Sequence, residues 1–159
     1  MDMFGTEVLG DYVEHMEVRE QDLVNVREVW RILSPNMRSI LGEFYKTQYL
    51  VQAHSQFRNF NVERLIEKQF AYWNNLFSGA IDSAYRDQVR NIGMTHRKYN
   101  ISMGQYILAY GWLLNRFEES VRKYTRCAER TLDLMSSVRR LVFIDMALAA
   151  DAYYVVFVD

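Results

Sequence analysis

Three histidines and one cysteine are the residues of this sequence that could bind a metal ion through nitrogen or sulfur. His15 lies in an acidic N-terminal stretch and His54 in a segment of irregular pattern, so we interpret both as surface residues. His96 differs, because an advance of 100° per residue places it on one helical face with Val89 and Ile92. A structural zinc ion needs four protein ligands, and the sequence has no cluster of cysteine and histidine to supply them.

A histidine on an apolar helical face has two interpretations. It can be a core residue whose ring nitrogens form hydrogen bonds, which is the simpler interpretation on residue type alone. It can also be the axial ligand of a haem iron, because the porphyrin supplies the other four nitrogens and one protein ligand is then enough. The eight methionines are more typical of adaptable core residues than of iron ligands. The residue pattern by itself leaves both interpretations of His96 open.

The distribution of apolar residues and helix breakers predicts a single domain made of helices. One proline and seven glycines leave few breaks, and 50% of the residues are apolar, which favours a few long helices around a core. Ser34, Asn61 and Ser102 are expected N-caps, and Gly79 is an expected C-terminal glycine. We predict a loose arm or short leading helix over residues 1–18, followed by helices over 20–33, 35 to about 50, 62–78, about 82–99, 103 to about 125, and from about 129 towards the end.

Composition argues against several classes of protein. A formal net charge of −1 gives no electrostatic reason to expect a nucleic-acid partner. No apolar run approaches the roughly 18 residues of a membrane span, and the acidic N-terminal stretch lacks the basic start of a secretory signal. Cys127 is the only cysteine, so no intramolecular disulfide can form, which fits a reducing compartment. We therefore expect a cytoplasmic protein with no membrane segment and no nucleic-acid partner.

Three segments resemble the sensor domain of globin-coupled sensors, which are haem-based oxygen sensors. These segments are residues 72–79 (YWNNLFSG), 92–96 (IGMTH) and 106–110 (YILAY). Residues 43–45 (EFY) and 144–149 (IDMALA) extend the similarity over most of the chain. Each segment alone is a weak signal, but their order and spacing together are specific. The resemblance implies an all-α, globin-like fold around haem b (iron protoporphyrin IX), with residues 19–159 as the sensor globin domain.

The resemblance also implies roles for individual residues. His96, the histidine of the Ile-Gly-x-x-His motif, is then the proximal ligand of the iron. Tyr45 is then the distal residue that donates a hydrogen bond to the gas, and bound oxygen carries negative charge that an O–H group in a dry pocket stabilises. The other residues expected to line the haem are Phe44, Ile66, Gln69, Trp73, Val89, Ile92 and Tyr106.

The sequence departs from the family pattern in two places. Gln69 stands where a hydroxyl residue is frequent, and it could either donate a second hydrogen bond to the gas or pair with the backbone. Asn100 replaces a glycine four residues after the histidine, and residues 103–105 (MGQ) replace a Pro-x-Trp motif. The turn after the proximal helix and the pose of His96 are therefore not carried over from the family.

The resemblance further implies how such a domain signals. Oxygen, carbon monoxide or nitric oxide would bind the open side of the iron and bias the packing of the last two long helices. In this family those helices form a four-helix bundle across a homodimer, which here corresponds to residues 102–125 and 129–158. Apolar stripes on these helices agree with that arrangement, at Ile107, Tyr110, Leu114 and Phe117 and at Met135, Val138, Val142 and Met146. The apolar residues at 153–158 suggest that the last helix continues into an output module, such as a chemotaxis, diguanylate cyclase or histidine kinase domain.

Two alternatives belong to other classes of protein. A haem-free, globin-like module of stress signalling would contain His96 as a structural residue only. An enzyme that turns over nitric oxide or peroxide would need a reductase segment or a distal acid–base pair, and neither is visible in the sequence. We therefore expect a sensory domain with no catalytic residues of its own.

Overall fold

The computed structural model describes residues 6–47 and 61–154, and every regular element in these ranges is a helix. This confirms the all-α class. The helices are α1 (Thr6–His15), α2 (Glu20–Leu33), the 3-10 turn η1 (Ser34–Asn36), α3 (Met37–Lys46), α5 (Val62–Phe77), α6 (Ser83–Lys98), α7 (Met103–Thr125) and α8 (Ala128–Tyr154).

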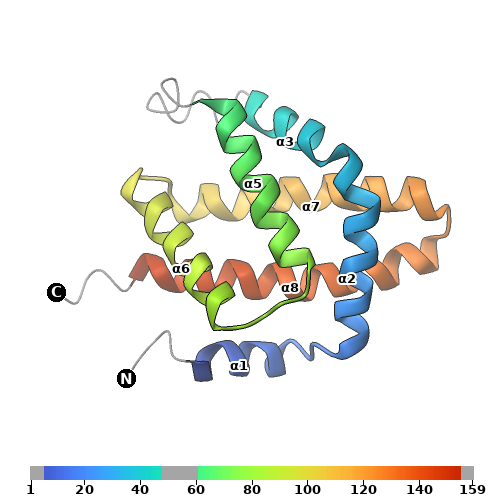
Figure 1. The fold of residues 1–159 in the computed structure, drawn as a ribbon, viewed down its shortest axis with the longest axis horizontal. Coiled ribbons are helices and arrows are strands. Elements are labelled where there is room, and N and C mark those ends of the chain that lie inside the picture. The colour runs from blue at the N-terminus through green and yellow to red at the C-terminus, as the bar shows by residue number, and fades with distance from the viewer. Residues whose placement is uncertain (1–5, 48–60, 155–159) are drawn as a thin grey trace.

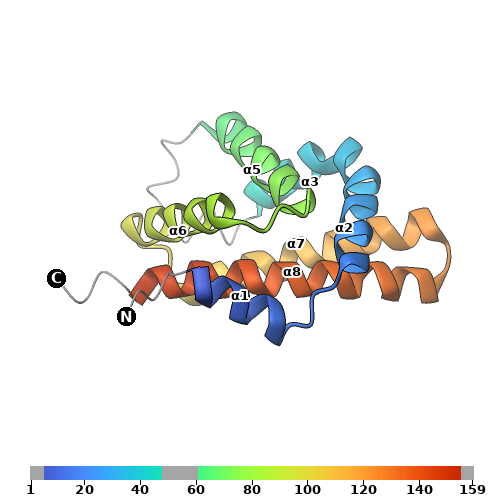
Figure 2. The same ribbon diagram turned by 60° about the horizontal axis from the view of Figure 1, so that its bottom comes forward.

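The two longest helices, α7 and α8, lie side by side in opposite directions and form one layer of the molecule (Figure 1). The helices α5 and α6 cross this pair on one side, with α3 next to α5 (Figure 2). The helix α2 crosses both α7 and α8 near the turn that joins them. Within the described ranges, no helix combines the length and hydropathy that crossing a lipid bilayer requires.

The first helix packs along α8 instead of extending away as a loose arm. Leu9 of α1 is buried, and the hydroxyl of Tyr12 donates a hydrogen bond to Asp151 of α8 at 2.6 Å. After the helix, the guanidinium of Arg140 donates to the backbone carbonyl of Met16 at 2.8 Å. Residues Thr6–His15 therefore form a short helix that packs on the rest of the fold.

Capping side chains define where several helices begin. Asn61, Asp82 and Ser102 precede α5, α6 and α7, and each side chain accepts a hydrogen bond from the backbone N–H three residues later. Ser102 and Gln105 also form a reciprocal capping box. Gly79 follows α5 with φ of +78°, a left-handed conformation that glycine adopts without strain. The predicted caps Asn61 and Ser102 and the predicted terminal Gly79 are confirmed.

The junction between α2 and α3 differs from its prediction. The sequence predicts a break capped by the side chain of Ser34, but this residue has helical torsion angles, φ −55° and ψ −37°, and η1 has no side-chain cap. Pro35 lies in the first turn of η1, where its missing N–H removes no hydrogen bond. The chain therefore passes from α2 to α3 through a tightened turn. The end predicted for this helix near residue 50 lies outside the described residues.

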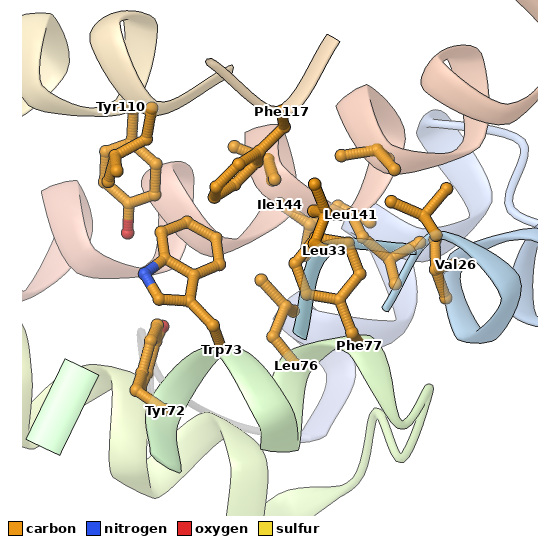
Figure 3. Packing of buried hydrophobic residues seen from close by; sticks show 14 of the residues in the cluster. Val26, Leu33, Tyr72, Trp73, Leu76, Phe77, Tyr110, Phe117, Leu141 and Ile144 are labelled. Atoms are coloured by element: carbon orange, nitrogen blue, oxygen red, sulfur yellow. The ribbon is translucent and has the colours of Figure 1, made fainter. Parts of the chain in front are cut away.

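Aromatic rings fill the space between the two layers (Figure 3). Trp73 and Phe77 of α5 point at Phe117 of α7, with ring centroids 5.2 Å and 6.0 Å apart. Leu33 of α2 completes this core and is fully buried. Val62 is 43% exposed, because it is the first residue of α5 and lies at the edge of the core.

The apolar stripes predicted on α7 and α8 serve mainly the core of the domain itself. Tyr110 and Phe117 are buried on α7, and so are Met135, Val138 and Val142 on α8. These residues are therefore not available to a partner. The large apolar side chains that remain exposed on these two helices, between 47% and 65%, include Ile107, Leu108, Leu132 and Phe143.

Candidate functional site

His96 lies in the last turn of α6, and its imidazole is oriented by the backbone. Its Nδ1 is 2.8 Å from the carbonyl oxygen of Ile92, one turn earlier in the helix. Because a carbonyl oxygen can only accept, Nδ1 carries the proton and Nε2 of the neutral ring keeps its lone pair. Burial lowers the pKa of His96 below its ordinary value, and the Ile92 hydrogen bond partly opposes this shift. The result is a neutral imidazole in the tautomer that binds a metal ion through Nε2.

Tyr106 of α7 packs edge-on against the imidazole of His96. The ring centroids are 4.9 Å apart, and the ring planes meet at 71°. The hydroxyl of Tyr106 forms a hydrogen bond with that of Tyr110 at 2.9 Å. Tyr106 is buried, so the phenol ring fixes one side of the imidazole while the Ile92 carbonyl fixes its rotation.

A second polar cluster joins α3 to α5 through three predicted site residues. The side-chain amide of Gln69 donates to the hydroxyl of Tyr45 at 2.6 Å, and the indole N–H of Trp73 donates to the amide oxygen of Gln69 at 3.1 Å. Phe44 packs edge-on against Tyr45. Burial raises the pKa of Tyr45, although the hydrogen bond from Gln69 lowers it. The phenol therefore keeps its proton at neutral pH and can donate it.

A row of rings connects this cluster to His96. Centroid distances are 6.1 Å from Trp73 to Tyr110, 5.0 Å from Tyr110 to Tyr106 and 4.9 Å from Tyr106 to His96. Trp73 points from α5 toward Tyr110 of α7 (Figure 3). The predicted residues thus form one group on α3 and α5 and a second on α6 and α7. They are joined through Tyr110, which the sequence analysis placed on the apolar stripe of α7 and not in the site.

The remaining predicted lining residues are aliphatic. Val89 is completely buried on α6, while Ile92 is half-buried on the same helix. Ile66 is half-buried on α5, one turn before Gln69 and Phe70. Of the other two histidines, His15 is exposed on α1, and His54 is outside the described residues.

A buried carboxylate beside this row of rings was missed at the sequence level. Asp145 of α8 is completely buried, and its two oxygens accept hydrogen bonds from the hydroxyls of Tyr72, Tyr85 and Tyr110. Burial raises the pKa of the Asp145 carboxyl, and the phenol donors act in the opposite direction. The signal that could have found it is one acidic residue within the apolar stretch 141–150 (LVFIDMALAA), on the buried face of its helix.

The donor set fits a haem better than a bare metal ion. In residues 6–47 and 61–154, no group of three or more histidine, cysteine, aspartate or glutamate side chains is placed to hold a metal ion. One neutral imidazole is sufficient for an iron that a porphyrin already holds. The ring of Tyr106 packs against His96, and the buried Val89 and half-buried Ile92 lie on the same helix, so this part of the fold offers the apolar surface that the faces of a porphyrin require.

Two surface hollows offer a different chemistry. One, of about 290 Å³ between α3 and α7, is lined by charged side chains that include Glu43 and Arg116. The other, of about 400 Å³, is formed by Cys127, Glu129 and Arg130 with one further acidic side chain at the start of α8. Neither hollow contains any of the predicted site residues, and neither suits a large apolar group.

Comparison with known proteins agrees with the fold described above. The model of the family described as Protoglobin matches residues 7–155. The structure is similar to that of the globin domain of the Geobacter sulfurreducens globin-coupled sensor, with a TM-score of 0.82 and 14% sequence identity. The match covers 91% of this chain and 97% of that chain. At this identity it shows a shared globin fold and no more. A comparison with curated proteins found no match.

Proposed function

Because this chain belongs to the Protoglobin family, we propose that it is a sensor domain that binds haem b through His96 and responds to oxygen, carbon monoxide or nitric oxide. The observation that carries the proposal is the hydrogen bond from Nδ1 of His96 to the Ile92 carbonyl. It leaves Nε2 unprotonated in an apolar setting, which is the state an axial iron ligand needs. The family assignment supports a binding role for the domain and not a catalytic one.

The predicted residues divide between several tasks in this proposal. Haem, when bound, would supply an iron that binds a diatomic gas reversibly. His96 would hold the iron, and Tyr106 would fix the plane of the imidazole. Tyr45 would donate a hydrogen bond to the gas. The apolar contacts to the porphyrin come from Phe44, Ile66, Trp73, Val89 and Ile92.

We further propose that α8 transmits the state of the site. It packs against α6, which carries His96, and against α7, which carries Tyr106. Asp145 of α8 also receives hydrogen bonds from α5, α6 and α7. A shift of either helix at the site therefore reaches α8 through packed side chains, and α8 would relay it to an output module.

A homodimer through α7 and α8 completes the proposal. Leu108 is 61% exposed and Leu132 is 65% exposed on these helices, where Phe143 is also half-exposed. Exposed large apolar side chains on neighbouring helices favour coverage by a partner. A second copy of the chain would supply that cover and would couple the two copies of α8.

Titration with hemin tests the haem-binding proposal. The purified protein should take up one equivalent of hemin and develop a sharp Soret band, which should shift when the reduced form meets carbon monoxide. His96→Ala should lose the sharp band because the axial nitrogen is gone. His15→Ala, at an exposed histidine on α1, is the matched control and should behave as the wild type. A folded protein that takes up no hemin would contradict the proposal and favour a haem-free signalling module, as would an unchanged band in His96→Ala.

A further inference from the structure

Gln69 is held between two side chains that fix the direction of its amide group. An indole N–H can only donate a hydrogen bond, so the atom of Gln69 that lies 3.1 Å from Nε1 of Trp73 must be the amide oxygen. The amide nitrogen is then the atom that faces the hydroxyl of Tyr45 at 2.6 Å. Because that nitrogen can only donate, the phenol oxygen of Tyr45 accepts.

The packing of Trp73 keeps its indole N–H in position to donate to the amide oxygen of Gln69. Trp73 is 3% exposed and is packed edge-on by Tyr110 and Phe117 of α7 (Figure 3). Gln69 and Trp73 are also four residues apart on α5, so their side chains lie on one face of a single rigid helix. The direction of the hydrogen bonds from Trp73 to Gln69 to Tyr45 is therefore set by the packing of the core.

A phenol that accepts one hydrogen bond still has its own hydrogen to donate. In the described ranges, Gln69 is the only side chain that forms a hydrogen bond with the hydroxyl of Tyr45, and it occupies the acceptor side of that oxygen. The O–H hydrogen is consequently directed away from Gln69. Successive hydrogen bonds polarise one another, so the donation from Gln69 also makes Tyr45 a stronger donor.

We propose that Gln69 is a positioning residue that makes Tyr45 an obligate hydrogen-bond donor and thereby favours oxygen over carbon monoxide. This inference rests on the proposed function, because it concerns a gas held by haem. A hydroxyl side chain at position 69 could donate or accept, and Tyr45 would then be free to donate to it. The glutamine removes that choice, since its amide oxygen faces Trp73 and its amide nitrogen, which can only donate, faces Tyr45. Gln69 thus acts through Tyr45 and does not itself contact the gas.

Gln69→Glu reverses the hydrogen bond between position 69 and Tyr45 with almost no change in the shape of the side chain. A glutamate accepts at both oxygens, so Trp73 can still donate to one oxygen while Tyr45 must donate to the other. The hydrogen of Tyr45 is then withdrawn from the gas. The oxygen dissociation rate of the haem-loaded protein should rise by about tenfold, as in Tyr45→Phe, because one charge-assisted hydrogen bond is lost in both. The affinity for carbon monoxide, a poor acceptor, should change much less.

Gln88→Glu is the matched control. Gln88 of α6 is half-buried and accepts a hydrogen bond from the side-chain amide of Asn75 at 2.7 Å, so a glutamate there keeps its partner and adds the same charge. This variant should retain the wild-type oxygen dissociation rate. If it matches the rate of Gln69→Glu, the added charge is responsible and the inference is wrong.

The double variant Tyr45→Phe with Gln69→Glu separates positioning from direct contact. If Gln69 acts through Tyr45, the second change should add nothing to the oxygen dissociation rate of Tyr45→Phe. A further rise in the double variant would show that Gln69 contacts the gas itself. An unchanged rate in the single variant Gln69→Glu would also overturn the inference.

A measurement before hemin is added distinguishes this inference from the proposed function. The protein has three tryptophans, and the indole N–H signal of Trp73, assigned with Trp73→Phe, should report a hydrogen bond that disappears in Gln69→Leu. An intact signal without hemin uptake would overturn the proposed function and with it the role of Gln69 toward a gas. Normal hemin uptake without such an indole hydrogen bond would overturn only the inference about Gln69.

Discussion

At the residue scale, burial acts in opposite directions on the two side chains expected to face the haem. It lowers the pKa of the His96 imidazole and raises the pKa of the Tyr45 phenol. The first side chain therefore remains a neutral base and the second a neutral acid around neutral pH. An iron ligand must have a free lone pair and a gas-stabilising donor must keep its proton, so the same physical cause suits both residues to their proposed tasks.

The lowered pKa of His96 predicts a specific loss of stability in acid. The unfolded chain binds a proton at His96 near pH 6.5, whereas the folded chain does so only at lower pH. The stability that neutral His96 contributes is therefore complete above about pH 6.5 and is lost as the pH falls through the folded pKa. Between pH 7 and pH 5, the free energy of unfolding of the haem-free wild type should fall more than that of His96→Gln, as urea titrations would measure.

His15→Gln is the control for this experiment, because His15 is exposed. Its stability should follow the wild-type pH profile. Parallel profiles for the wild type and His96→Gln would show that the imidazole is not held neutral by the fold.

At the sequence level, the surroundings of a side chain could be predicted where the signal was local and not where its partners come from other helices. His96 could be placed because the spacing from Val89 and Ile92 is a property of one helix. The role of Gln69 was left open, because the direction of its amide depends on Trp73 and on Tyr45 of a different helix. Asp145 was missed for the same reason, since its three donors lie on α5, α6 and α7.

At the element scale, the close approach of α6 to α8 positions the helix that carries His96. Gly93 is buried where the two helices meet, three residues before His96. A Cβ atom added at Gly93 would lie 2.7 Å from the carbonyl oxygen of Ala149 and 2.8 Å from Cβ of Ala152. Glycine is therefore needed here for contact between helices and not for an unusual backbone conformation.

Gly93→Ala should force α6 away from α8. We expect a loss of about 1–3 kcal/mol in the free energy of unfolding, as for other overpacked cores, together with weaker binding of hemin. Gly111→Ala on α7 is the matched control, because nothing lies within 4 Å of the added atom. That control should be neutral or up to about 1 kcal/mol more stable, since alanine favours a helix over glycine. Equal thermal midpoints for the two variants would contradict this account of the helix contact.

Helix ends were predictable to the extent that capping side chains define them. Asn61, Ser102 and Gly79 act within their own turns, so the sequence alone placed them correctly. Ser34 was assigned a cap that it does not form, because its backbone stays helical and continues from α2 into the 3-10 turn η1. A capping residue type therefore marks a helix end only where the backbone leaves the helical conformation.

At the scale of the whole molecule, the predicted globin fold is confirmed, while the homodimer stays a prediction. The fold was predictable because the order and spacing of several motifs are distributed along most of the chain. The surface available for a partner could not be predicted in the same way, since Tyr110 and Phe117 of the predicted stripe are buried in the core of the domain. Only the structure separates these residues from the exposed Leu108 and Phe143 of the same helix pair.

Leu108→Glu combined with Phe143→Glu should abolish the homodimer while leaving hemin binding intact. Both side chains are exposed, so the changes cost little stability in a monomer but place charges in the proposed interface. Sedimentation of the haem-loaded protein across a range of concentrations measures the outcome. Val24→Glu, at a residue of α2 that is 46% exposed, is the control and should leave association unchanged. A monomeric wild type, or a double variant that still dimerises, would refute the proposed interface.

The carboxylate of Asp145 has a mechanical consequence for α8. An aliphatic residue at this position would permit a small displacement of α8 along its axis. With a carboxylate shared by Tyr72, Tyr85 and Tyr110, any such displacement would leave at least one buried phenol without its hydrogen-bond partner. These hydrogen bonds therefore favour one axial position of α8 relative to α5, α6 and α7. Motion transmitted through α8 is then expected to be a tilt of the helix about this carboxylate, because a slide along the helix axis or a rotation about it would break the hydrogen bonds.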